Sequence, residues 1–146
     1  MRYPEQLIAL MRKDLTQFGV SETRTPEEVD RFLGPKSGTV LMVINSVCGC
    51  AAGKARPAVG LALTHQNRPD ATATVFAGAD VEAVARVREL LAGYPPSSPS
   101  MAIFQDGKPV YMLHRHQIES SQAPEIAEEL TAAFDKFCVK IPANAR

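Results

Sequence analysis

The stretch VLMVINSVCGC at residues 40–50 decides the fold of this chain and carries its most reactive side chains. From Thr39 to Ile44 every residue is β-branched or aliphatic, without polar alternation, which is typical of a central strand buried on both faces. Cys48 and Cys50 follow this strand closely, with a single glycine between them. Because reactive groups in open α/β sheets gather beyond the carboxyl ends of strands, this cysteine pair is the first candidate site.

Outward from this stretch, the sequence alternates between helical and extended patterns. It predicts helices over residues 4–18, 25–33, 51–63, 80–93 and 123–137, and further strands over residues 71–77, 101–105 and 110–113. The Asp106-Gly107 pair between the last two strands indicates a hairpin. Strands separated by helices pair in parallel through right-handed crossovers, whereas hairpin strands are antiparallel. We therefore expect the α/β class, as a three-layer α/β/α sandwich with a mixed central sheet and extra N-terminal helices.

Length and composition favour one domain over residues 1–146, in which residues 1–37 form a helical extension and residues 139–146 a flexible tail. The chain has 16 basic and 16 acidic side chains, so its net charge of zero favours neither nucleic acid nor a membrane as a partner. We recognise no signal peptide and no apolar run long enough to span a bilayer, and we therefore expect a cytoplasmic protein. The oligomeric state is left open.

The cysteines themselves indicate redox chemistry, because three are too few, and odd in number, for a secreted disulfide framework. A cysteine at the start of a helix meets free backbone N–H groups and the positive end of the helix dipole, which stabilise the nucleophilic thiolate. We therefore expect a lowered pKa for Cys48, with help from Lys54 and Arg56 if they face the loop. The glycine allows a strained, easily reduced ring to close between Cys48 and Cys50. Two alternatives are a pair of space-filling buried cysteines and a copper or zinc site made by the thiolates.

Together with the element order, two further features resemble the thioredoxin fold. Pro57 lies within the helix after the cysteines, similar to the proline that kinks this helix in thioredoxins. The segment from Ser98 to Phe104, followed by Asp106-Gly107, looks like the place where thioredoxins have a cis-proline before a strand and hairpin. The resemblance implies that Pro99 is cis and lies beside Cys48.

More specifically, the chain resembles the bacilliredoxins, also described as the YphP/YqiW family, from about residue 4 to residue 138. The resemblance is carried by the Cys-Gly-Cys stretch within residues 43–57, by SSPSM at 97–101 and by AAFDKFC at 132–138. It implies that Cys48 attacks mixed disulfides between bacillithiol and protein cysteines, with Cys50 as the candidate resolving thiol. Bacillithiol is then the exchanging small thiol, no other cofactor is needed, and bacillithiolated proteins are the partners.

Further candidates surround this pair, and other functions stay open. The expected substrate-binding residues are Gly49, Ser98, Pro99, Ser100 and Arg115, and Cys138 is a candidate third redox thiol. Arg115 could bind the carboxylates of an acidic thiol, while Ser98 and Ser100 could bond a substrate backbone or only water. Cys138, near the end of the last helix, could also simply pack against the sheet. The rival functions are a general disulfide isomerase or oxidoreductase and, more distantly, a copper or zinc carrier.

Overall fold

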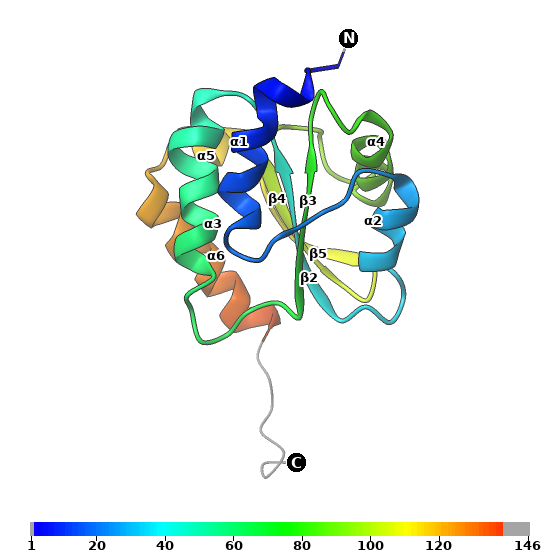
Figure 1. Cartoon of the computed structure of the whole chain (residues 1–146). Coiled ribbons are helices and arrows are strands. Elements are labelled where there is room, and N and C mark those ends of the chain that lie inside the picture. The colour runs from blue at the N-terminus through cyan, green and yellow to red at the C-terminus, as the bar shows by residue number, and fades with distance from the viewer. Residues whose placement is uncertain (1, 139–146) are drawn as a thin grey trace.

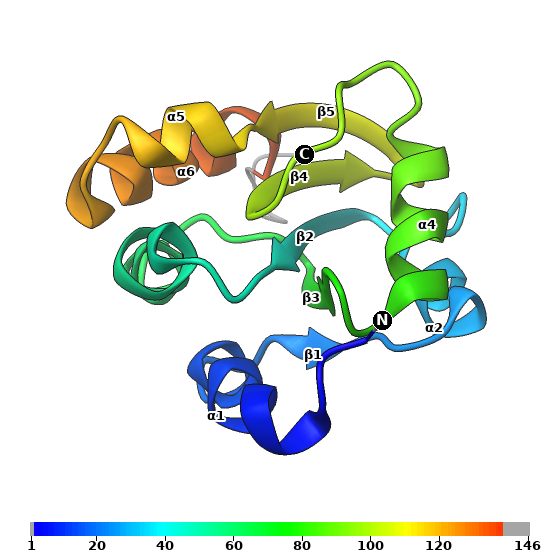
Figure 2. The same ribbon diagram turned by 90° about the horizontal axis from the view of Figure 1, so that it is seen from above.

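The computed structural model describes residues 2–138 and is built around a five-stranded sheet with the strand order β1-β3-β2-β4-β5. Its elements are α1 (Glu5–Thr16), β1 (Ser21–Glu22), α2 (Pro26–Phe32), β2 (Thr39–Asn45), the π-helical turn η1 (Ala51–Ala55), α3 (Arg56–Ala62), β3 (Ala71–Phe76), α4 (Val81–Leu90), β4 (Ser100–Gln105), β5 (Lys108–Leu113), α5 (Arg115–Glu119) and α6 (Ala123–Phe137). Helices cover both faces of the sheet: α1, α3, α5 and α6 on one side, α2 and α4 on the other (Figure 2). The predicted α/β sandwich is confirmed, whereas the predicted tail at 139–146 lies outside the described residues.

Strand β2 lies at the centre of the sheet and determines which loops meet at its carboxyl end. It runs parallel to β3, with Asn45 opposite Phe76, and antiparallel to β4, with Ile44 opposite Ser100. The turn after β3 and the loop before β4 therefore lie beside the segment that follows β2. The N-terminal segment lies at this same end of the sheet (Figure 1). Five separate parts of the sequence thus come together there, because β5 also ends at this edge and leads into α5.

The lack of polar alternation in β2 follows from its burial on both faces. All 7 of its residues are buried. Leu41 and Val43 point into the core formed with α1, α3 and α6, whereas Met42 and Ile44 point into the core formed with α2 and α4. Burying a large aliphatic side chain contributes about 1.5–3 kcal/mol, so both layers depend on this one strand.

Two short elements were not predicted from the sequence. Residues 21–22 form β1, which pairs in parallel with β3, so the first 37 residues contribute an edge strand to the sheet as well as helices. Two residues are too few for any periodicity to be visible. The second missed element is the short helix α5, which begins at Arg115, directly after His114. Its start is capped by the side chain of Gln117, which accepts a hydrogen bond from the His114 N–H at 2.8 Å.

The helix after the cysteines begins differently from the prediction of one continuous helix. Residues 51–55 form the π-helical turn η1, and the α-helix α3 follows with Pro57 in its first turn. Pro57 has no backbone N–H to donate to the preceding turn, and that turn is the irregular, π-helical part of this helical segment. The hairpin at Asp106-Gly107 is confirmed, and both residues have positive φ values, of 50° and 83°.

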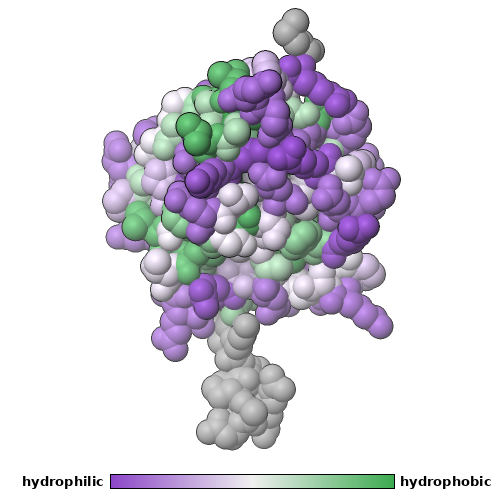
Figure 3. Space-filling view, viewed as in Figure 1, coloured by the Kyte–Doolittle hydropathy of each residue, from purple (hydrophilic) through white to green (hydrophobic). Residues whose placement is uncertain are grey.

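The surface carries mixed polar and apolar residues. On the face shown in Figure 3, hydrophilic residues dominate and the apolar areas are small and separate. Among the described residues, no helix has both the length and the apolar character required to cross a bilayer.

The central place of β2 gives the first testable prediction. Leu41→Ala removes a fully buried side chain and should lower the free energy of unfolding by about 2–5 kcal/mol, because a cavity is left in the core. Leu61→Ala is the matched control, because Leu61 is 50% exposed and its truncation should cost less than about 1 kcal/mol. Urea denaturation measures both values, and equal losses in the two variants would contradict the double-sided burial of β2.

Candidate active site

The two cysteines of the Cys-Gly-Cys motif lie beyond the carboxyl end of β2, where the chain turns into η1. Their Sγ atoms are 2.6 Å apart, and both side chains are partly exposed. The Cys48 carbonyl accepts hydrogen bonds from the N–H groups of Ala51 and Ala52 at 3.1 and 3.2 Å, which close the turn around the thiols. The motif therefore presents two neighbouring thiols, one of which can donate a hydrogen bond to the other.

A buried polar cluster holds the Cys48 loop from below. The Ser46 hydroxyl accepts a hydrogen bond from the Cys48 N–H at 3.2 Å and donates to its Sγ at 3.3 Å. Asn45 Oδ1 accepts from the Ser46 N–H at 2.9 Å and from Arg56 at 3.0 Å. Arg56 is only 3% exposed, donates to the Ser46 carbonyl at 2.9 Å and pairs with Asp14 at 3.1 Å. Arg56 therefore supports the loop. It does not face the thiols, which the sequence had left open.

The surroundings of Cys48 favour its thiolate form. Partial burial is the largest single influence and by itself raises the pKa of this thiol. Hydrogen bonds from Cys50, Ser46 and the Ala51 N–H oppose that effect, and the positive charge of Arg115 adds to them. The net result is a pKa for Cys48 below the ordinary cysteine value, in the direction expected from the sequence.

Cys50 is shifted in the opposite direction. Burial raises the pKa of its thiol most, and its hydrogen bond to Cys48 and the charge of Cys48 raise it further. Arg115 lowers the pKa of Cys50, whereas Glu119 raises it. Because the two shifts are opposite, Cys48 is the thiol that ionises first, and Cys50 keeps its proton to higher pH.

Arg115 comes from α5 and connects three parts of the site. Its guanidinium pairs with Glu119 at 2.5 Å and donates to the Ser98 carbonyl at 3.1 Å. Its backbone N–H donates to the Ser97 hydroxyl at 3.3 Å. Lys54, at the end of η1, donates to the Glu119 carbonyl at 2.5 Å, so α5 is tied to both the proline loop and the cysteine turn. Arg115 itself stays exposed to solvent beside the thiols.

A hollow of about 380 Å³ opens beside Cys48. It is lined by Tyr3, Ser46, Val47, Cys48, Ala77, Gly78, Ser98 and Arg115. Cys48, Ser98 and Arg115 were proposed from the sequence, and the structure brings these three together. Tyr3 and the Ala77-Gly78 turn were missed, because only the parallel pairing of β3 with β2 brings that turn to the site.

The other predicted substrate-binding residues do not line this hollow. The Ser98–Pro99 peptide bond is cis, as the sequence resemblance implied, and Pro99 is buried. Ser100 is fully buried, and its hydroxyl donates to the Ser97 carbonyl at 2.7 Å, so it braces the loop and is not accessible to a substrate. Gly49 is exposed between the thiols. Ser98 is therefore the serine of this loop that we retain as a candidate substrate contact.

Cys138 is not brought to the site. It is 3% exposed and lies near Thr39, the first residue of β2, whereas Cys48 follows the last residue of the same strand. A strand of 7 residues separates the two ends by about 20 Å. Burial raises the pKa of the Cys138 thiol, although Thr39 lowers it in part. Cys138 is thus placed as a packing residue of the core, and direct exchange with Cys48 is excluded in this structure.

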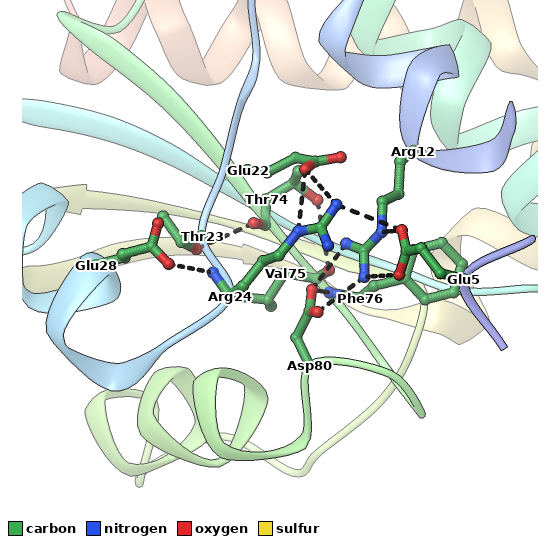
Figure 4. A network of polar contacts seen from close by, with 10 residues as sticks. All are labelled: Glu5, Arg12, Glu22, Thr23, Arg24, Glu28, Thr74, Val75, Phe76 and Asp80. Atoms are coloured by element: carbon green, nitrogen blue, oxygen red, sulfur yellow. Dashed lines mark hydrogen bonds and ion pairs between the residues drawn. The ribbon is translucent and has the colours of Figure 1, made fainter. Parts of the chain in front are cut away.

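An ion-pair network fixes α1 and the N-terminal segment near the site (Figure 4). The guanidinium of Arg12 donates to both carboxylate oxygens of Asp80 at 2.8 and 2.9 Å and to Glu5 at 2.7 Å. Arg12 also lies 5.3 Å from the centre of the Phe76 ring. An aspartate directly before a helix usually caps it, but the Asp80 side chain does not cap α4, and its carboxylate instead accepts the Phe76 N–H at 3.0 Å. A residue that resembles a helix cap therefore ties α1 to β3.

A metal carrier would have to rely on the two thiolates alone. Within residues 2–138, no group of three or more His, Cys, Asp or Glu side chains is arranged to hold a metal ion. Structural metal sites of the zinc type take four ligands, which two adjacent cysteines do not provide.

Solved structures with this arrangement of strands and helices include thioredoxins. Oxidised thioredoxin from Plasmodium falciparum matches with a TM-score of 0.54 and 17% identity, over 82% of this chain and 99% of that chain. A mutant thioredoxin from Halobacterium salinarum gives a TM-score of 0.56 and 16% identity, over 84% and 93% of the two chains. The fold is therefore that of thioredoxin, and the paired thiols at the end of β2 define the protein as a thiol–disulfide oxidoreductase.

Sequence relatives give the particular family. A family model described as "Disulphide isomerase" matches residues 3–138, and the chain belongs to this family. Its curated relatives include bacilliredoxins. The Bacilliredoxin of Salinibacter ruber is 55% identical over 94% of this chain and 82% of its own length. Those of Koribacter versatilis and Halalkalibacterium halodurans are 47% and 46% identical, each over 93% of this chain and 94% of their own lengths. The resemblance seen in the sequence is confirmed.

The support of the Cys48 thiolate by Ser46 gives the second prediction. Ser46→Ala removes one hydrogen bond to the thiolate and should raise the Cys48 pKa by about one pH unit. Because the thiolate forms as the pH rises through the pKa, the alkylation rate of Cys48 should then increase only at higher pH than in the wild type. Site-resolved mass spectrometry of alkylation over a pH series measures this shift.

Ser37→Ala is the matched control, because its hydroxyl donates to the Gly34 carbonyl before β2 begins. This variant should leave the Cys48 profile unchanged. An unchanged profile in Ser46→Ala as well would contradict the role given to the Ser46 hydroxyl.

Proposed function

We propose that this protein removes bacillithiol from mixed disulfides on protein cysteines, with Cys48 as the attacking thiol. The observation that carries the proposal is the lowered pKa of Cys48 beside a hollow that also holds a cation, Arg115. A thiolate is the form that attacks a disulfide, and an arginine suits the carboxylates of an acidic small thiol. The relatives named bacilliredoxin support the same reaction.

In the first step, the Cys48 thiolate attacks the bacillithiol sulfur of the mixed disulfide. A bond forms between Cys48 Sγ and that sulfur, and the bond to the client cysteine breaks. The client leaves as a thiolate with the electron pair of the broken bond and is thereby reduced. It then takes a proton from water, while Cys48 becomes part of the new mixed disulfide. Arg115 stays beside the reacting sulfur and stabilises negative charge there, as it does for the free thiolate.

In the second step, Cys50 loses its proton and attacks Cys48 Sγ. The Cys48–Cys50 disulfide forms as the bond between Cys48 and bacillithiol breaks, and bacillithiol leaves as a thiolate that takes up a proton from water. The Cys50 pKa is raised while Cys48 carries a charge, and this influence disappears once Cys48 is bound in a disulfide. Two electrons from a thiol reductant then return the pair to the reduced state. We propose that the cycle runs in the cytoplasm, where thiols are kept reduced.

The division of labour between the thiols gives the third prediction. Cys50→Ser lacks the resolving thiol, so after mixing with a bacillithiolated protein it should accumulate a Cys48 adduct of the mass of bacillithiol, with the client set free. Cys48→Ser should neither form an adduct nor release the client. Intact-mass spectrometry measures both. Equal, mild losses in the two variants would contradict the assignment of Cys48 and Cys50.

A general disulfide isomerase is the second candidate, because the family model carries that description. Such an enzyme would rearrange scrambled protein disulfides without any small thiol. If the wild type reactivates a scrambled protein but leaves bacillithiolated clients intact, this candidate replaces the first. Metal analysis of the reduced protein tests the more distant carrier, and a stoichiometric copper or zinc content would support it.

A further inference from the structure

The hollow beside Cys48 has an aromatic wall that the exchange of thiols alone does not require. Tyr3 lines it together with Cys48 and Arg115, and its side chain is 40% exposed. A volume of about 380 Å³ lies in the range of small-molecule sites and is small for a folded protein partner. A hollow of this size suits the small-thiol half of the mixed disulfide better than the client.

Tyr3 is held in place by the turn that follows β3. Its backbone N–H donates to the Gly78 carbonyl at 2.9 Å. A Cβ atom at position 78 would lie 2.5 Å from Tyr3 Cε2, so the ring rests directly on the backbone of this glycine. Gly78 also has a φ of 84°, which few other residues adopt. The aromatic ring is thus positioned by backbone contacts, although its residue belongs to the segment before the first helix.

The segment that carries Tyr3 is itself fixed to the rest of the site. α1 begins two residues later and is tied to the body of the fold by the Arg12–Asp80 ion pair. Asn45, below the cysteine loop, donates to the Met11 carbonyl at 3.2 Å. Tyr3 is therefore held directly by the turn at Gly78, and the helix α1 that follows it is fixed through Asp80 and Asn45.

We propose that Tyr3 is a specificity-determining residue that binds the small-thiol half of the mixed disulfide together with Arg115. The ring of Tyr3 packs against the C–H groups of that thiol, and the Arg115 guanidinium binds its carboxylate. This proposal rests on the proposed function, since it names the subsite in which bacillithiol lies while Cys48 attacks its sulfur. A small thiol without a carboxylate or an extended carbon skeleton gains nothing from either contact.

The fourth prediction tests this subsite with two substrates that share one client protein. One carries bacillithiol on its cysteine, and the other carries mercaptoethanol, which is neutral and too short to span the hollow. Tyr3→Ala should lower the rate of bacillithiol removal at limiting substrate about tenfold, through a higher KM. Its rate with the mercaptoethanol disulfide should stay within about twofold of the wild type. Tyr3→Phe keeps the ring and should retain the preference.

Phe18→Ala is the matched control. Phe18 is also 40% exposed and also rests on a glycine, Gly60, but it lines a separate hollow of about 580 Å³ at the other end of the sheet. It should behave as the wild type on both substrates. Thermal unfolding of Tyr3→Ala and Tyr3→Leu shows whether the fold is kept, and Tyr3→Leu serves as the test variant if the alanine variant is unstable.

The possible outcomes separate the proposals. A loss confined to the bacillithiol substrate supports Tyr3 as a specificity residue. Equal losses on both substrates, or no loss on either, overturn that role while the proposed function stands. If the wild type releases mercaptoethanol but not bacillithiol from the client, the proposed function itself fails, whatever the Tyr3 variants do.

Discussion

The hydrogen bonds of Asn45 at the end of β2 are the interaction on which the site depends most. Its side chain accepts from the Ser46 N–H and from Arg56 and donates to the Met11 carbonyl. Its backbone carbonyl accepts the Ala77 N–H at 3.0 Å. One buried residue therefore connects the cysteine loop, α3, α1 and the turn after β3. Because each of these segments supplies a wall of the hollow or supports one, the position of Cys48 relative to its surroundings is set here.

The chemistry of the two thiols follows from the different surroundings of Cys48 and Cys50, although only one residue separates them. Cys48 receives hydrogen bonds that favour its thiolate and lower its pKa. Cys50 donates a hydrogen bond to Cys48, and this bond and the negative charge of Glu119 raise the Cys50 pKa. Arg115 provides positive charge from α5, an element that the sequence did not reveal. The same arginine also donates a hydrogen bond to the Ser98 carbonyl. One side chain therefore both supplies positive charge to the thiols and positions the proline loop.

Much of this fold could be predicted because the decisive sequence patterns lie within single segments of the chain. The unbroken apolar run from Thr39 to Ile44 identified the central strand, and the cysteines after it identified the site. What could not be predicted depends on pairing between distant segments. β1 is too short for a pattern, and Tyr3 lines the hollow beside Cys48 only because β3 lies parallel to β2. Cys138 was a reasonable candidate by residue type, but the strand direction places it at the opposite end of the sheet.

The most direct test of the account is a site-resolved measurement of thiol reactivity in the reduced wild-type protein at neutral pH. Limited alkylation followed by peptide mass spectrometry gives separate rates for Cys48, Cys50 and Cys138. Cys48 should react first, Cys50 should follow slowly because its pKa is raised, and buried Cys138 should react last. Equal rates for Cys48 and Cys50, or a faster reaction at Cys138, would contradict the claim that the end of β2 creates one activated thiol.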